Sequence, residues 1–281
     1  MENSTLVCDL QGGVGNQLFQ IAAVYSLAKR LGSTMAILDQ QFSGAGQGSH
    51  PSKYYDVLYR RLNRVSAVQE PILRYNERQW TAYDIDADIR ALPLCKTLIL
   101  KGYFQSERYF HSPTAIRALF TPDEGIRDYL RAHTDLFKRY PDLLAKDGCL
   151  LGVRRGDYLN HAHVHNPCGM DYYKKAMRLL PATQYYIATD DMAWCRANFV
   201  GDQYVFFDIK DDLVQFYAGC LFNKYIIGNS SYHWWMSFLS VYETPTVVAP
   251  DKWLFGPDVK WEQYSSIYRK GMVVVERAIE S

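Results

Sequence analysis

The 281-residue sequence predicts an α/β protein built from two Rossmann-like lobes, each with a parallel sheet covered by helices. Two observations predict this class. The chain begins with a strand–helix–strand unit whose first turn is rich in glycine, and its second half alternates short apolar runs with helical segments of about ten residues. The length also exceeds what one small core needs. We expect an N-terminal lobe over 1–145 and a C-terminal lobe over 146–281.

The first unit is read directly from its pattern. Residues 5–10 form an apolar run typical of a strand, and the sequence QGGVG follows as a turn. The next segment is apolar on most faces, carries Lys29 and Arg30 near its end and stops at Gly32, which predicts a buried helix with cations at its negative end. Residues 34–39 then form a second strand.

The pattern of strands and helices is irregular in the middle of the chain and regular in its second half. Residues 40–110 contain one convincing strand at 96–101, and 114–147 read as mainly helical, which suits a crossing between lobes. The remaining strands are expected at 150–153, 184–189, 204–208, 224–228 and 246–250. The helices between them are expected at 171–180, 191–199, 212–222 and 231–240.

Composition and charge exclude several classes of protein. The formal net charge is +1, so no global field favours nucleic acid or an acidic membrane, and any anion site must be local. The six cysteines are scattered without a C-x-x-C pair, which argues against a zinc site and for a reduced, intracellular protein. Neither a signal peptide nor a membrane span is evident, so we expect a cytoplasmic protein.

Polar and charged residues follow each strand expected in the second half. In an open parallel sheet, ligands bind outside the carboxyl ends of the strands, so these residues should converge on one rim. Arginine offers a planar donor fork for phosphate, hydroxyls at a helix N-terminus add an anion cradle, and aspartate accepts from a guanine edge or a sugar hydroxyl. The rim residues are Arg154, Arg155, Asp157, Asp190, Asp191, Asp208, Asp212, Asn229, Ser230 and Ser231. Together they suit a nucleotide diphosphate that carries a sugar.

Structural roles compete with this interpretation. Asp190, Asp191 and Ser231 stand where helices begin and would serve equally as N-caps. Arg154 and Arg155 would equally pair with the nearby Asp157 and bind nothing else.

The glycine-rich turn admits two interpretations. QGGVGNQ resembles the dinucleotide fingerprint, and Asp39 stands where a ribose-binding acid would, but Leu18 replaces the third glycine; a dehydrogenase is therefore the alternative. In the competing interpretation the glycines let the backbone approach a ligand in a cleft between the lobes, with amide contacts at the start of the helix. The residues concerned are Gly12, Gly13, Gly15, Asn16 and Gln17.

A possible metal-binding pair lies in the first half. Asp84 and Asp86 form the D-x-D pattern with which many sugar transferases hold a divalent metal. No strong strand precedes this pair, and Arg154 with Arg155 would neutralise phosphate without a metal. We therefore expect neither a metal nor another cofactor.

Six segments, in order, resemble the successive motifs of the α-1,2-fucosyltransferases of glycosyltransferase family 11. They are GGVGNQLFQIAA, GYFQSERYF, VRRGDY, TDDMAWC, IIGNSSYHWW and VVAPDKW, and they span residues 12–253. The resemblance implies a two-lobed GT-B-like architecture with a donor-binding cleft between the lobes. It also implies GDP-β-L-fucose as donor, inversion at the anomeric carbon and no metal. The implied acceptor is the 2-hydroxyl of a terminal β-galactoside.

The resemblance also assigns roles to residues. Arg154 would hold the β-phosphate, with Arg155 and Asp157 shaping the same loop, and Arg154 and Asp157 are the expected catalytic residues. The remaining donor contacts would come from Gly13, Gly15, Asn16, Gln17, Asp190, Asp191, Asp212, Asn229, Ser230 and Ser231. Asp157 and Asp191 both stand as candidates for the general base. Two alternatives stay open: another nucleotide sugar as donor, or a non-catalytic nucleotide- or glycan-binding protein.

The chain departs from the family pattern at one position. The family carries a histidine two residues before the first arginine, in the pattern H-x-R-R-G-D, where this sequence has Gly152. In related fucosyltransferases that histidine lies near the guanine, so one base contact is expected to be missing.

Overall fold

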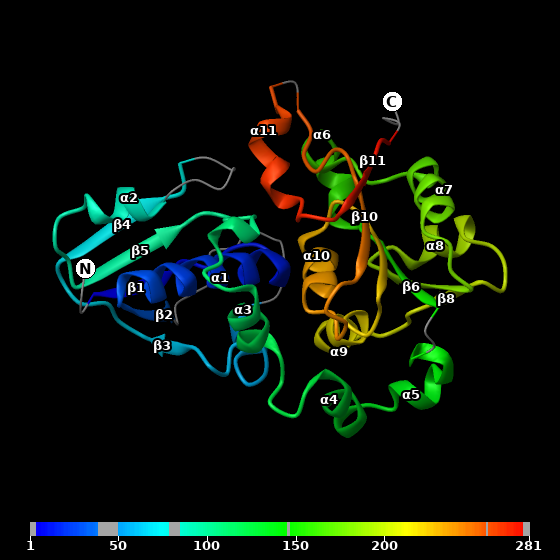
Figure 1. The fold of residues 1–281 in the computed structure, drawn as a ribbon, viewed down its shortest axis with the longest axis horizontal. Helices are drawn as coiled ribbons and strands as arrows, with labels where there is room; N and C mark the ends of the chain where they lie inside the picture. The colour runs from blue at the N-terminus through cyan, green and yellow to red at the C-terminus, as the bar shows by residue number, and fades with distance from the viewer. Residues whose placement is uncertain (1–3, 39–49, 79–84, 145–146, 257, 278–281) are drawn as a thin grey trace. The chain divides into compact units, whose positions relative to one another are not determined.

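Two parallel sheets organise the chain, as the alternation of strands and helices predicts (Figure 1). The structure is a computed structural model that describes residues 4–38, 50–78, 85–144, 147–256 and 258–277. Contacts divide the chain into two compact units. Unit 1 comprises Met1–Phe120 and Lys260–Arg269, and unit 2 comprises Thr121–Val259 and Lys270–Ser281.

Unit 1 contains a five-stranded sheet in the order β3-β2-β1-β5-β4, with every pair of neighbours parallel. Its strands are β1 (Thr5–Cys8), β2 (Thr34–Leu38), β3 (Asn63–Val65), β4 (Ile72–Asn76) and β5 (Thr97–Lys101). Its helices are α1 (Val14–Leu31), α2 (Ile85–Arg90), α3 (Pro113–Phe120) and α11 (Trp261–Tyr264), with the 3-10 turns η1 (Pro51–Tyr54), η2 (Glu107–Tyr109) and η5 (Ser265–Ile267).

Helix α1 is the buried helix that the sequence predicts. Fourteen of its eighteen residues are buried, as its mostly apolar surface requires. It ends at Gly32, whose φ of +63° is the left-handed conformation that glycine adopts without steric cost, and Lys29 and Arg30 occupy its last turn. The strand–helix–strand unit β1–α1–β2 is therefore confirmed.

Unit 2 contains a six-stranded sheet in the order β11-β10-β9-β6-β7-β8, also parallel throughout. Its strands are β6 (Gly148–Val153), β7 (Gln184–Thr189), β8 (Tyr204–Phe206), β9 (Lys224–Ile227), β10 (Thr246–Pro250) and β11 (Val273–Val275). Its helices are α4 (Ile126–His133), α5 (Leu136–Arg139), α6 (Ala162–His165), α7 (Met170–Leu179), α8 (Met192–Asn198), α9 (Asp212–Gly219) and α10 (Ser231–Phe238), with the turns η3 (Pro141–Leu144) and η4 (Asp157–His161).

Helices cover both faces of this second sheet, because its central strands are apolar on both sides. All six residues of β6 are buried. Cys149, Leu151 and Val153 point into a core shared with α7 and α8, whereas α9 and α10 lie on the other side of the strands (Figure 1). Consecutive residues of β6 therefore face different helices.

The boundary between the units differs from the expected break after residue 145. Helices α4 and α5 belong to unit 2, because the ring of Tyr129 packs edge-on against Tyr217 with centroids 5.2 Å apart. The Tyr140 hydroxyl also donates to the Phe206 carbonyl at 3.2 Å. Near the other end of the chain, residues 260–269 return to unit 1, where η5 contacts η2. The local sequence pattern predicts where these helices lie along the chain, but not which unit they pack against.

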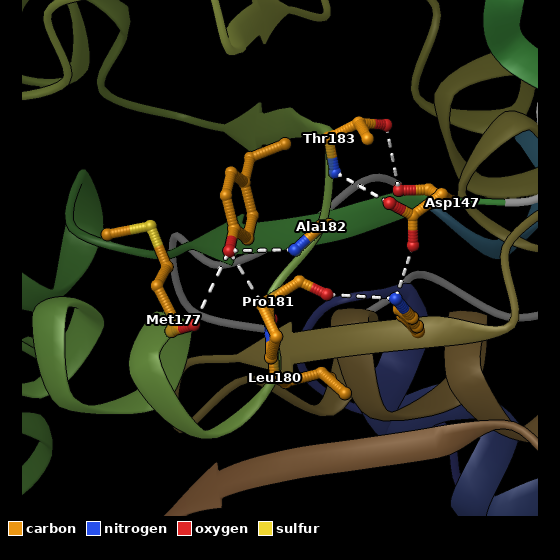
Figure 2. A network of polar contacts seen from close by, with 8 residues as sticks. Asp147, Met177, Leu180, Pro181, Ala182 and Thr183 are labelled. Atoms are coloured by element: carbon orange, nitrogen blue, oxygen red, sulfur yellow. Dashed lines mark hydrogen bonds and ion pairs between the residues drawn. The ribbon is translucent and has the colours of Figure 1, made fainter.

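Polar contacts tie together the amino ends of the central strands in unit 2. Asp147, which precedes β6, accepts from Lys224 Nζ at 2.5 Å and from the Thr183 backbone at 3.0 Å, and Lys224 also donates to the Pro181 carbonyl at 2.8 Å (Figure 2). The Tyr185 hydroxyl accepts from Ala182 N at 3.1 Å. This edge is fixed by internal contacts, so the opposite, carboxyl edge is the one available for a ligand.

Candidate active site

The order of strands in unit 2 creates a topological switch point between β6 and β9. From β6 the chain proceeds to β7 and β8 on one side of the sheet, and β9, β10 and β11 then build the other side. Ligands of open α/β sheets bind at such a point, outside the carboxyl ends of the strands. Arg154 follows β6, Asp190 follows β7, and Ser230 lies just beyond β9, so three adjacent strands deliver these residues to one edge.

Arg154 is held between two carboxylates. Its Nη2 lies 2.8 Å from Asp157 Oδ1, and its Nε lies 3.1 Å from Asp190 Oδ2. Its guanidinium also stands 5.5 Å from the centre of the Tyr158 ring. Burial opposes the charge, but Asp190 and Asp157 outweigh it and raise the pKa of Arg154. Arg154 therefore does pair with Asp157, which the sequence left open, and it pairs with Asp190 as well.

Arg155 is fixed by its backbone and by its side chain. Its backbone N–H donates to Asp190 Oδ1 at 2.9 Å, and its Nε donates to Asp191 Oδ2 at 3.3 Å. The guanidinium lies 4.1 Å from the centre of the Trp194 ring, a distance suited to a cation–π contact. Only 14% of the side chain is exposed. Arg155 therefore shapes the loop more than it offers a free cation.

Asp190 and Asp191 have different roles. Asp191 is the N-cap of α8, because its Oδ1 accepts from the Trp194 backbone at 3.1 Å, as the structural interpretation predicts. Asp190 caps no helix and instead joins Arg154 to the backbone of Arg155. The formal charge of this cluster, two arginines against Asp157, Asp190 and Asp191, is −1. An anionic ligand at this edge would therefore have to share or replace the carboxylates that hold the arginines.

The N-terminus of α10 lies beside this cluster in the sheet order. Ser230 is its N-cap, 3% exposed, and no side-chain capping bond is formed; Ser231 begins the helix and is partly exposed. The first backbone N–H groups of a helix attract anions. Asn229 behaves differently, because its Nδ2 donates to the carbonyls of His165 and Trp253, and the residue is 1% exposed. Its side chain thus fixes neighbouring loops.

Asp212 and its neighbours lie at the start of α9. Asp211, not Asp212, is the N-cap, and its Oδ1 accepts from the backbones of Leu213 and Val214 at 2.9 Å. The Asp212 carbonyl accepts from the Tyr232 hydroxyl at 2.5 Å, which connects α9 to α10. Asp208 is exposed, and its carbonyl accepts from Arg139.

The glycine-rich turn in unit 1 has one position that requires glycine. Gly12 has a φ of +74°, and a Cβ there would lie 2.7 Å from Asn16 Nδ2. Gly13 is the N-cap of α1 with ordinary extended backbone, and a Cβ there would meet nothing within 4 Å. Gly15 is buried in the first turn of the helix. The turn itself therefore requires glycine at position 12 but not at position 13.

The two amides of this turn are engaged within unit 1. Gln17 is fully buried, donates to the Gly12 carbonyl at 3.0 Å and accepts from the Tyr59 hydroxyl at 2.9 Å, so it holds the turn together. Asn16 is partly exposed and accepts from Gln105 Nε2 at 2.8 Å. Gln105 lies in the segment GYFQSERYF and was not among the residues predicted from the sequence.

Three further residues near the arginines were missed. Trp194 stacks on Arg155, and the Tyr158 hydroxyl donates to the Asn229 carbonyl at 2.9 Å while its ring stacks on His165 with centroids 4.3 Å apart. His233 lies in the first turn of α10 and is 3% exposed. Each sits inside a segment that the family resemblance marks, but nothing local in the sequence indicates what its side chain contacts.

One aspartate of the D-x-D pair lies in α2 and forms an ion pair. Asp86 is bound by Arg30 through contacts of 2.8 Å, while Asp84, like Asp39 at the proposed ribose position, lies outside the described residues. Among residues that the structure describes, no group of three His, Cys, Asp or Glu side chains is placed to hold a metal ion. Within the same residues, no helix has both the length and the apolar character needed to cross a membrane.

Comparisons with known proteins agree with this geometry. The chain is 26% identical to the O-antigen biosynthesis glycosyltransferase WbnK of Escherichia coli, with 88% of this chain and 94% of WbnK covered. It is 22% identical to an α-1,2-colitosyltransferase of Escherichia coli, with 89% and 92% covered. Both named relatives are glycosyltransferases.

Solved structures share the fold. The fucosyltransferase NodZ from Bradyrhizobium superposes with a TM-score of 0.51 at 13% identity, with 88% of this chain and 94% of NodZ covered. A NodZ structure described as an α-1,6-fucosyltransferase soaked with GDP-fucose gives a TM-score of 0.50 at 13% identity, with 89% and 96% covered. The expected α/β fold of GT-B type is confirmed. Because the family model described as glycosyl transferase family 11 matches residues 3–276, the chain belongs to that family of glycosyltransferases.

Proposed function

We propose that this glycosyltransferase moves L-fucose from GDP-β-L-fucose to a glycan hydroxyl with inversion, forming an α-1,2 linkage to a terminal β-galactoside. The observation that carries the proposal is the pair of Arg154 and the α10 N-terminus, which adjacent strands bring to the switch point of unit 2. A guanidinium fork and the first backbone N–H groups of a helix are both suited to a diphosphate. The donor assignment also draws on NodZ, whose structure was soaked with GDP-fucose.

In the proposed reaction, an acceptor hydroxyl attacks the anomeric carbon on the face opposite the diphosphate. The bond from that carbon to the diphosphate oxygen breaks, GDP departs with the electron pair, and the hydroxyl proton passes to a base. Negative charge grows on the departing oxygen, so a cation fixed there stabilises the transition state more than the bound donor. Arg154 has this role, and no metal is required for it.

The carboxylates around Arg154 hold it in place before the donor binds. Asp157 and Asp190 contact two different nitrogens of the guanidinium, which fixes its plane as well as its position. The donor phosphate then exchanges with one of these partners. Asp157 and Asp191 remain the two candidates for the base that takes the acceptor proton, and the remaining sequence-predicted donor contacts, including Asp212 and Gly15, stay part of the proposal.

A colitose donor should be tested beside GDP-fucose, because one relative is an α-1,2-colitosyltransferase. We would measure thermal stabilisation by GDP, GDP-fucose, GDP-colitose, GDP-mannose, UDP-sugars and NAD, since a ligand that binds only the folded state raises the melting temperature. GDP and GDP-fucose should stabilise the protein, and NAD should not. Stabilisation by UDP-sugars or NAD alone would overturn the donor assignment.

Transfer to a terminal β-galactoside, measured with and without EDTA, tests the reaction itself. The Arg154→Ala variant should stay folded and lose about 10²–10³ in rate, the size expected for one lost contact to the developing charge. Arg131→Ala is the matched control, because Arg131 is also paired with an aspartate three residues away, at 2.7 Å, but is 58% exposed on α4. Near-normal transfer by Arg154→Ala would refute its role.

A further inference from the structure

The side chain of His233 occupies the space that any side chain at position 152 would need. A Cβ built on Gly152 would lie 2.5 Å from His233 Cγ and 2.6 Å from its Nδ1. Gly152 is on the β6 face opposite the core shared with α7 and α8, and His233 reaches that face from α10. The glycine in β6 and the histidine in α10 therefore depend on each other: only a residue without a Cβ leaves room for the ring.

The backbone around Gly152 cannot easily move to relieve such a clash. Its carbonyl accepts from Gly228 N at 3.0 Å and from the Tyr173 hydroxyl at 3.2 Å. The imidazole thus packs on a fixed part of β6. Gly152 precedes Arg154 by two residues, and His233 follows the N-cap Ser230 by three residues. The ring is therefore near both groups that the proposed function assigns to the diphosphate.

The chemical state of His233 is unusual for a buried residue. It is 3% exposed, yet its Nδ1 is fully buried without a hydrogen-bond partner in the part of the chain that the structure describes. Burial, assisted by the charge of Arg154, lowers the pKa of His233 to about 3, so the ring is neutral near pH 7. A buried polar nitrogen without a partner destabilises a fold, whereas a phenyl ring would fill a similar space without that penalty. Packing alone therefore does not account for a histidine here.

We propose that the donor site takes its imidazole from His233 on α10 instead of from a histidine on β6. Gly152, which has no side chain, leaves the space that the His233 ring occupies. Resting on the proposed function, His233 is a positioning residue for donor binding: the neutral ring supports the carboxyl end of β6 so that Arg154 faces the diphosphate. Neutrality matters because a charged imidazolium would repel Arg154, and a neutral imidazole still offers one donor and one acceptor nitrogen.

This inference predicts that the nitrogens, and not only the volume, of the ring at 233 are needed. His233→Phe keeps an aromatic ring and removes both nitrogens. We expect the melting temperature to be kept or raised, while the Kd for GDP weakens about tenfold. The KM for donor should rise with that Kd, and the KM for acceptor should stay unchanged.

A transplant tests whether the imidazole can return to the strand. His233→Ala alone should weaken GDP binding, and the double variant Gly152→His/His233→Ala, which supplies the ring from β6, should recover most of it. Met236→Leu is the matched control, because Met236 lies on the same helix, buried against Gly219 as His233 is against Gly152. It should leave the Kd for GDP unchanged even where it lowers the melting temperature.

The measurements separate this inference from the proposed function. If the wild-type protein does not bind GDP, the proposed function fails. If the wild type binds GDP and His233→Phe binds and transfers equally well, His233 only fills space and the inference is overturned. A folded transplant that stays as weak as His233→Ala would also overturn it, and a transplant that does not fold leaves His233→Phe to decide.

Discussion

Asp157→Asn is the perturbation that most directly probes the paired state of Arg154. The asparagine has the shape of the aspartate, and its amide oxygen can take the place of Asp157 Oδ1, which lies 2.8 Å from Arg154 Nη2. The loop geometry should therefore persist while one negative charge is removed. The pair is about one third exposed, so the loss of stability should stay within about 1 kcal/mol.

The effect on GDP binding follows from the geometry. A phosphate on another edge of the guanidinium would lie about 7 Å from the Asp157 carboxylate, and removing the repulsion is worth about 0.6 kcal/mol in water and about 2.4 kcal/mol at an effective dielectric constant of 20. For a partly exposed group we take about 1 kcal/mol, which is about fivefold in Kd. Asp157→Asn should therefore bind GDP about fivefold more tightly than the wild type.

Isothermal titration with GDP at low and at high salt measures this effect. The gain should shrink as salt rises, because exposed charges are screened. Asp128→Asn is the control, since Asp128 pairs with Arg131 at 2.7 Å with the same three-residue spacing but is 64% exposed. Unchanged or weaker binding by Asp157→Asn would refute the reasoning. The turnover of Asp157→Asn then tests which residue is the general base. A loss of about 10²–10⁴-fold in rate would assign that role to Asp157, and a retained rate would favour Asp191.

Two predictions concern unit 1. Glu77 Oε2 accepts from the backbones of Tyr103 and Phe104 and supports a φ of +49° at Phe104, so Glu77→Ala should cost about 2–4 kcal/mol in urea unfolding. Burial raises the pKa of Glu77, so its contribution to stability is present at low pH and is lost as the pH rises through that pKa. Glu77→Gln keeps a hydrogen-bond acceptor and should remove this dependence of the unfolding free energy on pH. An unchanged pH dependence would contradict the assignment. Gly12→Ala should cost about 1–3 kcal/mol, whereas Gly13→Ala should leave stability within about 0.5 kcal/mol, so a loss of transfer by a fully stable Gly13→Ala would show that this backbone approaches a ligand.

Five of the six strands of unit 2 were predicted, because each is a short apolar run between clear breaks; β11 was not predicted, and β8 ends two residues earlier than expected. β7 and β10 have the predicted bounds, and β6 and β9 differ by one or two residues. In unit 1, β3 and β4 were not predicted. Their residues are mostly exposed or partly exposed, so no apolar pattern marks them. Their pairing with β2 and β5 is decided by contacts distant in the sequence.

The candidate site was predictable only to the level of the rim. Topology places Arg154 and Asp190 at neighbouring strand ends, and the structure confirms that neighbourhood. The identity of each hydrogen-bond partner depends on side-chain geometry that no spacing encodes: Asn229 proves to be engaged with backbone carbonyls, and Asp191 caps a helix. The complementarity of Gly152 and His233 joins positions 81 residues apart, so the departure at Gly152 was visible in the sequence while its counterpart was not.

The paired arginines give a physical reason for a site with formal charge −1 to receive an anion. Two bare guanidinium groups at a partly buried edge would repel each other and would cost stability in the absence of donor. With Asp157 and Asp190 in place, Arg154 is oriented and neutralised. In the proposed function, binding a diphosphate would exchange one anionic partner for another instead of creating a new ion pair. The displaced carboxylate returns to solvent, and it is available to pair with Arg154 again when GDP leaves, which would keep the product from binding too tightly. In that proposal, the same exchange would place a carboxylate near the reacting centre at the moment when the acceptor hydroxyl must lose its proton.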